Sequence, residues 1–470
     1  MTRERVNVLW LFCEDLNPWL PLWGDSTVET PNIDALAAGG VRFTNAHTPS
    51  PVCSPSRSAV ITGCMATSFG AHNHFSSRPG MPPIELPAQV RPLPLLMKDA
   101  GYYTFNHGKD DYNFEYDRDA YYSGKWQVVN PYGKHAPGNA RGGQEDRDFR
   151  QWRGRAESQP FFGQITLWAG KNQLRVPGPA VDPSTVTVPP YYPNTGSFRE
   201  AIARHYDQIR TTDREVGQIV ADLKADGLLD NTIICFFSDH GYLMLRGKQF
   251  CYDSGTHSPL IIAGPAELLP EEQGTERPEV STTLDITATT LALAGEPVPQ
   301  WMESEDLFSE DAGRDFVIST RDRCDAAIDR IRSVRTDRFR YIRNFYTSKP
   351  LMQPQYRMNQ PCYKEYRQMW QRGLLNQTQA FFAGDERLPE ELYDCQTDPH
   401  ECQNLANHPA YADELAHLRE ILTDWMRESG DRGGEKEADE LYEWYFNNWP
   451  AEQTCSPEFK QFREHNRGTS

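Results

Sequence analysis

Two strand-length apolar runs constrain the fold of this chain more than any other feature of its sequence. Residues 6–12 read Val-Asn-Val-Leu-Trp-Leu-Phe, and residues 232–237 read Thr-Ile-Ile-Cys-Phe-Phe. A nearly unbroken apolar run of this length is typical of a strand buried on both faces, as in a parallel sheet covered by helices. Polar residues follow both runs directly: Glu14, Asp15, Asp239 and His240. Because open α/β sheets bind ligands at the carboxyl ends of their strands, we expect these four side chains to line one site.

The length of the chain predicts more than one structural unit. A chain of 470 residues is too long for a single hydrophobic core. We expect an α/β domain over residues 1–305, with a large, mostly parallel sheet flanked by helices, and a smaller α+β domain over residues 306–470. In the first domain, apolar residues at helical spacing predict a long helix over residues 198–228. In the second, an antiparallel sheet and a covering helix are expected from residues 316–319, 331–334, 338–344 and 409–428.

The composition excludes several classes of partner. The net charge of -18 argues against nucleic acid. We expect no membrane-spanning segment, because no window of about 18 apolar residues occurs.

Residues 1–5 lead into the first strand without an apolar leader, which predicts a cytoplasmic protein if this N-terminus is native and a periplasmic or secreted one if a signal was trimmed. The ten cysteines predict no disulfide framework, although Cys395 and Cys402 could pair in an oxidising compartment.

A cysteine-containing stretch at residues 51–63 predicts a helix that begins at an anion-binding site. It reads Pro-Val-Cys-Ser-Pro-Ser-Arg-Ser-Ala-Val-Ile-Thr-Gly. Ser54 and Pro55 favour the first positions of a helix, whose unpaired N–H groups and positive dipole end attract an anion. Arg57 would add a forked, permanently charged donor at the same place. The alternative is a buried cysteine, Cys53, at the start of an ordinary helix.

This stretch resembles the signature of the type I, formylglycine-dependent sulfatases of the alkaline phosphatase superfamily, which combine a Cys-X-Pro-X-Arg core with a later Thr-Gly. Residues 30–34, Thr-Pro-Asn-Ile-Asp, match a second pattern of that family. The resemblance implies an alkaline phosphatase-like fold. It also implies that a maturation enzyme oxidises Cys53 to formylglycine, whose hydrated aldehyde is the nucleophile, and that Arg57 holds the sulfate. Over residues 316–430 the chain is most similar to the heparan N-sulfatase (sulfamidase) branch.

A divalent cation is expected where the acidic residues meet. Carboxylates gathered from two strand ends repel one another unless a hard cation neutralises them, and calcium, which accepts about six to eight oxygens, suits such a set better than zinc. The resemblance implies one Ca²⁺ per chain, held by Glu14, Asp15, Cys53 as formylglycine, Asp239 and His240. Glu14 stands where the family more often has Asp. The alternative for His240 is a residue that orients the sulfate or the nucleophile.

Two lysines are candidates for binding the sulfate. Lys109 follows a predicted strand at residues 102–106 and falls where many sulfatases have a Gly-Lys whose lysine reaches a sulfate oxygen. The histidine that usually comes two or three residues later is replaced by Asp111 and Tyr112. Lys248 matches a basic residue of the family that contacts the sulfate. The resemblance therefore implies a small cationic pocket on an acidic protein.

The general acid is left open between two residues. Lys171 stands where family members commonly have a histidine that acts on the leaving group. A lysine there could bind the sulfate, or donate a proton if burial and neighbouring cations lowered its pKa. His257 lies two residues before a Pro-hydrophobic segment and could line the pocket, or could simply begin the strand there.

These features predict an enzyme that hydrolyses sulfate groups, as O-sulfate esters or N-sulfates, from a sulfated sugar or glycan. The expected partners are a sulfated carbohydrate and the formylglycine-generating maturation enzyme. Residues 431–470 could border the pocket or form a homo-oligomer contact. Two alternatives stay open, namely a phosphonate monoester or phosphodiester hydrolase of the same superfamily and a non-catalytic binder of sulfated polysaccharide.

Overall fold

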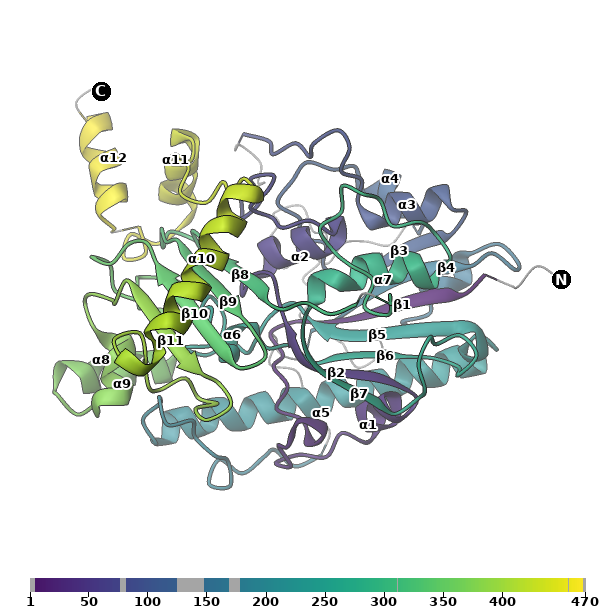
Figure 1. Ribbon diagram of the computed structural model, residues 1–470, viewed down its shortest axis with the longest axis horizontal. Coiled ribbons are helices and arrows are strands. Elements are labelled where there is room, and N and C mark those ends of the chain that lie inside the picture. Colours follow the sequence, from purple (N-terminus) through teal and green to yellow (C-terminus); the bar gives the residue numbers. More distant parts are fainter. Residues whose placement is uncertain are drawn as a thin grey trace.

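Two β-sheets form the frame of the computed structural model, which describes residues 5–76, 82–124, 148–168, 178–310, 312–454 and 456–467 (Figure 1). The first sheet has the strand order β3-β4-β1-β5-β6-β2-β7, and the second has the order β11-β10-β9-β8. The strands of the first sheet are β1 (Asn7–Cys13), β2 (Gly40–His47), β3 (Tyr103–His107), β4 (Phe161–Leu167), β5 (Thr232–Ser238), β6 (Leu260–Ala263) and β7 (Thr275–Thr282). Those of the second sheet are β8 (Val317–Arg321), β9 (Ile331–Arg335), β10 (Phe339–Asn344) and β11 (Glu390–Asp394).

The first sheet is mostly parallel, which confirms the prediction from the sequence. β1 pairs in parallel with both β4 and β5, β3 with β4, and β2 with β7. β6 runs antiparallel to its neighbours β5 and β2. β1 and β5 lie side by side, with Cys13 level with Ser238 at their carboxyl ends. The residues that follow these two strands therefore meet at one edge of the sheet.

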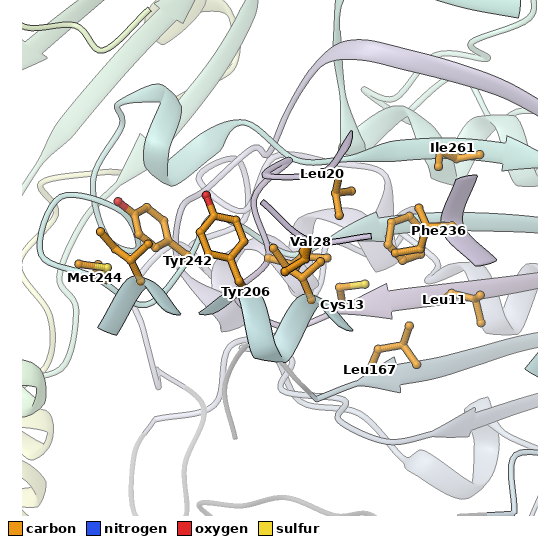
Figure 2. Packing of buried hydrophobic residues seen from close by; sticks show 14 of the residues in the cluster. Leu11, Cys13, Leu20, Val28, Leu167, Tyr206, Phe236, Tyr242, Met244 and Ile261 are labelled. Atoms are coloured by element: carbon orange, nitrogen blue, oxygen red, sulfur yellow. The ribbon is translucent and has the colours of Figure 1, made fainter. Parts of the chain in front are cut away.

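Helices cover both faces of this sheet and account for the apolar runs in the sequence. The first face carries α1 (Pro31–Ala38) and α5 (Gly196–Ala225), and the second carries α2 (Cys53–Thr62), α3 (Leu93–Asp99) and α7 (Ile286–Leu293). Leu9 and Leu11 of β1 pack into the core of the first face, whereas Trp10 and Phe12 pack into that of the second. Figure 2 shows the first core, where Leu11 lies near Phe236 of β5. Every residue of β1 and β5 is buried, as their sequences predict.

The second sheet is antiparallel, and its neighbouring strands pair in sequence order from β8 to β11. Three of its strands lie where the sequence predicts them, but β11 was missed. The predicted covering helix is α10 (Ala412–Glu428), which contacts β9 and β10 and buries Leu415, Leu418 and Leu422 (Figure 1). The domain boundary at residue 305 stays a prediction.

The remaining helices are short or lie near the C-terminus: α4 (Arg118–Tyr121), α6 (Asp253–Thr256), α8 (Pro361–Gln371), α9 (Gln377–Ala383), α11 (Asp439–Asn448) and α12 (Pro457–Arg467). Tyr445 of α11 and Phe459 of α12 are buried in a small cluster with Ala326 of the β8–β9 connection. Among the described helices, none is both long and apolar enough to cross a membrane. The nine described cysteines form no disulfide with one another, and Cys395 and Cys402 are thiols.

Candidate active site

The carboxyl ends of β1 and β5 bring four polar side chains together. The backbone N–H of Asp239 donates to the carbonyl of Cys13 at 3.0 Å, which continues the ladder past the last strand residues. The N–H of Asp15 then donates to Asp239 Oδ1 at 3.1 Å, and Asp15 takes a left-handed conformation with φ 56°. Glu14, Asp15, Asp239 and His240 are all fully buried. The convergence expected from the two apolar runs is therefore present.

The cysteine lies at the first residue of α2, with its thiol pointing into this cluster. Cys53 Sγ is 3.2 Å from His240 Nε2 and 2.9 Å from Lys248 Nζ. Lys248 Nζ also donates to Asp15 Oδ1 at 2.7 Å. Because Lys248 comes from the loop after β5, three distant segments meet at the thiol. A cation this close favours an anionic atom at position 53.

His240 is oriented by its own backbone neighbour. Its Nδ1 lies 2.9 Å from the carbonyl of Gly241, so Nδ1 carries the proton and Nε2 faces the cluster. Nε2 lies 3.3 Å from Asp15 Oδ1 and 3.6 Å from Asp239 Oδ1. Burial alone would lower the pKa of His240, but the nearby negative charges, that of Asp239 first, raise it. A metal-ligating imidazole needs this arrangement, in which one nitrogen is tied to a carbonyl and the other is available.

Glu14 is held by two cations. Arg57 Nη2 lies 2.6 Å from Glu14 Oε1, and Lys109 Nζ lies 3.1 Å from the same oxygen. Lys109 Nζ also lies 2.9 Å from Asp111 Oδ2. Asp111 occupies one of the two positions at which the resembled family has a histidine. The guanidinium of Arg57 stacks on the ring of Phe12, 4.1 Å from its centroid. Arg57 and Lys109 thus stand at the acidic cluster, as expected.

The donor set suits a hard divalent cation. Two groups of side chains bring their ligand atoms within 4.8 Å of one another, namely Asp15, Cys53 and His240, and Glu14, Cys53 and Asp239. Burial raises the pKa of Asp239 to about 7, and the charge of Glu14 adds to this. A cation bound here would remove that repulsion and hold Asp239 ionised. Carboxylate oxygens with one imidazole are ligands that a divalent metal accepts.

The structure describes only one of the two candidates for the general acid. Lys171 lies outside the described residues. His257 Nε2 lies 2.9 Å from the carbonyl of Thr44, and its ring stacks on His47 with centroids 5.2 Å apart. Burial lowers the pKa of His257. These contacts are those of a residue that joins β2 to β6, and the expectation that His257 lines the pocket is not supported.

Sequence reasoning missed two hydroxyl groups that support the centre. Thr48 Oγ1 and Ser56 Oγ each donate to the carbonyl of Asp239 at 2.7 Å, and so tie the end of β5 to α2. Ser56 lies in the Cys-X-Pro-X-Arg stretch, whose pattern leaves that position open. No local signal marks Thr48, because its role depends on how the residue after β2 lies against Asp239, which follows β5.

This chain is similar to known proteins over most of its length. The family model described as Sulfatase matches residues 6–296. The chain is 33% identical to an ulvan-active sulfatase of Formosa agariphila over 91% of its own length and 76% of that protein, and 28% identical to the N-sulphoglucosamine sulphohydrolase of Homo sapiens over 90% of each chain. The phosphonate monoester hydrolase of Agrobacterium radiobacter shares the fold, with a TM-score of 0.65 at 20% identity, over 90% of this chain and 96% of that one.

Proposed function

Because the chain belongs to the sulfatase family and is a sulfuric ester hydrolase, we propose that it removes sulfate groups from a sulfated glycan. One observation carries the proposal. The Cys53 thiol lies 2.9 Å from Lys248 and 3.2 Å from His240, among the carboxylates at the ends of β1 and β5. Attack on an anionic sulfate ester requires a nucleophile that lies between a cation and side chains able to bind a metal ion.

Position 53 and the acidic cluster would be completed by two groups. As formylglycine, residue 53 would supply a hydrated aldehyde with a hydroxyl nucleophile. A Ca²⁺ held by Asp15, Asp239, His240 and residue 53, with Glu14 at its edge, would neutralise the carboxylates and polarise a sulfate oxygen. The buried oxygens of these side chains support calcium more than zinc, which prefers nitrogen and sulfur ligands.

The basic residues of the chain would bind the sulfate. Lys248 and Lys109 present ammonium groups to different carboxylates of the cluster, and Arg57 presents a guanidinium from the first turns of α2. All three are nearly fully buried, so they are held in place before a substrate arrives. Cations fixed in this way stabilise charge that develops on the sulfate oxygens without reorganising during the reaction.

The substrate class follows from the relatives. One relative is named for activity on ulvan and another for hydrolysis of N-sulphoglucosamine, and both match along most of this chain. We therefore propose a sulfated polysaccharide or its fragments as substrate, with an O-sulfate ester as the first choice and an N-sulfate as the second. The formylglycine-generating enzyme is the partner that the mechanism needs, and Lys171 stays a candidate for the general acid.

A phosphonate monoester or phosphodiester hydrolase is the second candidate, because such an enzyme shares the fold over nearly the whole chain. The non-catalytic alternative is not retained, since the chain is a sulfuric ester hydrolase.

Initial rates of the mature protein on 4-nitrophenyl sulfate, 4-nitrophenyl phosphate and a phenylphosphonate monoester separate the sulfatase from the phosphonate hydrolase activity. We expect kcat/KM for the sulfate ester to exceed the others, and the proposal fails if the phosphonate is the best substrate. Desulfated products from ulvan, heparin, chondroitin, carrageenan and fucan oligosaccharides would then identify the sugar.

A further inference from the structure

A buried histidine–aspartate pair lies between the segment that follows α2 and the second sheet. His74, Cys324 and Asp325 bring their side-chain donor atoms within 4.8 Å of one another, and all three residues are buried. His74 Nδ1 lies 2.9 Å from Asp325 Oδ1 and 3.6 Å from Cys324 Sγ. His74 comes from the segment after α2, and Asp325 from the connection between β8 and β9. The pair therefore joins the nucleophile helix to the second sheet.

The backbone around His74 is tied to the nucleophile helix α2. The N–H of Phe75 donates to Ser54 Oγ at 3.3 Å, and Ser54 directly follows Cys53. Asn113 links the same two segments, because its N–H donates to Ser58 Oγ at 2.8 Å and its Nδ2 donates to the carbonyl of Asn73 at 2.6 Å. These bonds fix the position of the pair relative to the thiol.

The charges of the catalytic centre reach the pair. Burial lowers the pKa of His74, and the charges of Asp325, Cys53 and Asp111 oppose that change. Burial raises the pKa of Cys324 well above its ordinary value, while the positive charge of Lys248 opposes it. Charges act on one another strongly only over short distances, so these effects agree with the bond from Phe75 to Ser54 in placing the pair near the thiol.

The pair is held rigidly from the side of the C-terminal helices. Arg323 Nη1 donates to the carbonyls of His74 and Asp325 at 2.8 Å each, and to Tyr445 Oη of α11 at 2.7 Å. The N–H of His74 donates in turn to the carbonyl of Arg323 at 2.9 Å. Asp325 has φ 52°, a left-handed conformation that is uncommon outside glycine, although aspartate adopts it more readily than most residues.

The surroundings favour a hydrogen-bonding role over a metal site. The thiol of Cys324 stays protonated, because burial raises its pKa, and the charges of Arg321 and Lys248 near it would repel a cation. Since burial lowers the pKa of His74, its ring is neutral near pH 7. A neutral ring that donates from Nδ1 to a carboxylate carries its lone pair on Nε2. Within the described part of the chain, no residue donates to that nitrogen.

We propose that His74 is a specificity-determining residue, whose Nε2 accepts a hydrogen bond from a hydroxyl of the sugar that carries the sulfate. Asp325 is the positioning residue that fixes the acceptor tautomer. This inference rests on the proposed glycan sulfatase function. A sulfated sugar has hydroxyl donors next to the sulfated carbon, whereas an aryl sulfate has the same sulfate and no such donor. A site built to pair with a hydroxyl rejects a substrate that lacks it.

The test compares two substrates in four variants of the mature enzyme: His74→Ala, His74→Gln, Asp325→Asn and the control His72→Ala. The substrates are 4-nitrophenyl sulfate and the ulvan or heparin oligosaccharide that the wild type desulfates. For His74→Ala we expect kcat/KM on the oligosaccharide to fall about 10- to 100-fold, mainly through KM, while the aryl sulfate changes by less than about threefold. Asp325→Asn should follow His74→Ala, and His74→Gln should recover part of the loss because its amide oxygen can accept a hydrogen bond.

His72 is a matched control, because it is buried in the same segment and burial also lowers its pKa, but its charged neighbours are Asp322 and Arg332. We expect His72→Ala to leave the ratio of the two kcat/KM values unchanged. Equal losses on both substrates in His74→Ala, or no loss on either, would overturn the inference. Melting temperatures of all variants identify those that fail to fold.

A binding measurement separates this inference from the proposed function. In a Cys53→Ala background, which cannot form the nucleophile, calorimetry measures the Kd of the same oligosaccharide with and without His74→Ala. We expect Kd to rise about 10-fold or more when His74 is removed. An unchanged Kd would refute the role of His74, whereas a wild type that hydrolyses no sulfate ester would refute the proposed function and leave the binding result interpretable.

Discussion

Lys248 is the residue that connects the Cys53 thiol to the acidic cluster. Its ammonium donates to Asp15 Oδ1 at 2.7 Å and lies 2.9 Å from Cys53 Sγ, and the residue is almost fully buried. A buried ammonium is stable only when anions surround it, so Lys248 also depends on the groups that it serves. The loop that carries it begins directly after the Asp239-His240 pair.

Replacement of Lys248 by Met keeps the length of the side chain and removes the charge. We expect kcat on 4-nitrophenyl sulfate to fall about 100- to 1,000-fold, because a fixed donor to the developing charge is lost. Steady-state kinetics measure the effect, with Lys98→Met as the control, since Lys98 lies at the surface and donates to the backbone carbonyl of Ala120. A Lys248→Met enzyme within tenfold of wild type would show that Lys248 does not stabilise the transition state.

Asp239 makes the calcium-free protein sensitive to pH. Burial raises its pKa to about 7, above the ordinary value of 3.8. Between about pH 4 and pH 7, the folded state therefore binds a proton that the unfolded state does not. The free energy of unfolding of the chelated protein should therefore fall as pH rises through that window, by up to about 4 kcal/mol from this group. Calcium bound as proposed would hold the carboxylate ionised and should reverse the loss.

The corresponding measurement is the melting temperature in EDTA and in calcium at pH 5 and pH 8. We expect calcium to raise the melting temperature more at pH 8 than at pH 5, because protons compete with the cation below about pH 7. Asp239→Asn should abolish most of the calcium effect at both pH values. A calcium effect that is equal at the two pH values, or larger at pH 5, would contradict the assignment of Asp239 as a ligand.

At the scale of elements, α2 matters because its first residue, Cys53, is the proposed nucleophile and because contacts at its last turn hold the helix in place. Gly63 ends the helix with φ 69°, and its N–H donates to the carbonyl of Ala59 at 2.8 Å. The carbonyl of Gly63 accepts from the N–H groups of Glu303 and Ser304 at 2.9 Å each. A Cβ at this position would lie 2.6 Å from Met302 Cγ and 2.9 Å from Ser304 Oγ.

Gly63→Ala should therefore lower the free energy of unfolding by more than the left-handed backbone conformation alone would. We expect a loss of about 2 to 4 kcal/mol in the free energy of unfolding, measured by urea denaturation. Gly295→Ala is the matched control, because Gly295 follows α7 with φ 75° and a Cβ added there would meet no described atom within 4 Å, so about 1 kcal/mol is expected. Equal losses in the free energy of unfolding for the two variants would show that the close approach of the added Cβ to Met302 and Ser304 does not destabilise the protein.

The sequence predicted those elements whose local pattern matches their burial. β1 and β5 read as apolar runs because both of their faces are covered, and the acids that follow them needed no further information to be placed at one edge. β11 was missed because its sequence, Glu-Glu-Leu-Tyr-Asp, places a carboxylate where a buried residue is expected. Glu391 is buried with donors from Asn344 and Tyr252, distant in sequence, at 2.7 and 2.9 Å, besides Tyr393 of the same strand at 2.7 Å. Local patterns do not report such partners.

The same limit applies to the site. Cys53, Glu14 and Asp239 lie at strand or helix ends, so their convergence follows from the topology of the sheet. His257 also lies at a strand end, yet its bond to Thr44 turns it toward β2. The His74–Asp325 pair was missed because His74 and Asp325 lie in connections, where the sequence carries no periodic signal.

At the scale of the whole molecule, a buried arginine joins the two sheets. Arg340 of β10 donates from Nη1 to the carbonyl of Cys251 at 2.8 Å and from Nη2 to Thr256 Oγ1 at 3.0 Å. It also binds the carboxylates of Asp253 and Glu401, with 2.7 Å from Nε to Glu401 Oε1. The segment 251–256 leads into β6, so this side chain sets where the second sheet sits against the site.

Arg340→Met should destabilise the protein by about 3 to 5 kcal/mol, because the buried carboxylate of Glu401 and the partly buried one of Asp253 each lose an arginine partner. Arg338→Met, on the same hairpin, should cost far less, since Arg338 is half exposed and its ion pair with Asp394 is screened by water. Urea denaturation followed by tryptophan fluorescence gives both values. A similar loss in the free energy of unfolding for the two variants would show that the buried contacts of Arg340 do not stabilise the packing of the two sheets.

The proposed mechanism depends on the identity of the nucleophile, and the mass of the peptide that contains residue 53 tests it most directly. In protein coexpressed with a formylglycine-generating enzyme, we predict a fraction of this peptide that is lighter than the thiol form by about 18 Da, the difference between cysteine and formylglycine. The rate of sulfate ester hydrolysis should rise in proportion to that fraction across preparations and vanish in Cys53→Ala. Full activity from protein in which every residue 53 is an unmodified cysteine would contradict the mechanism.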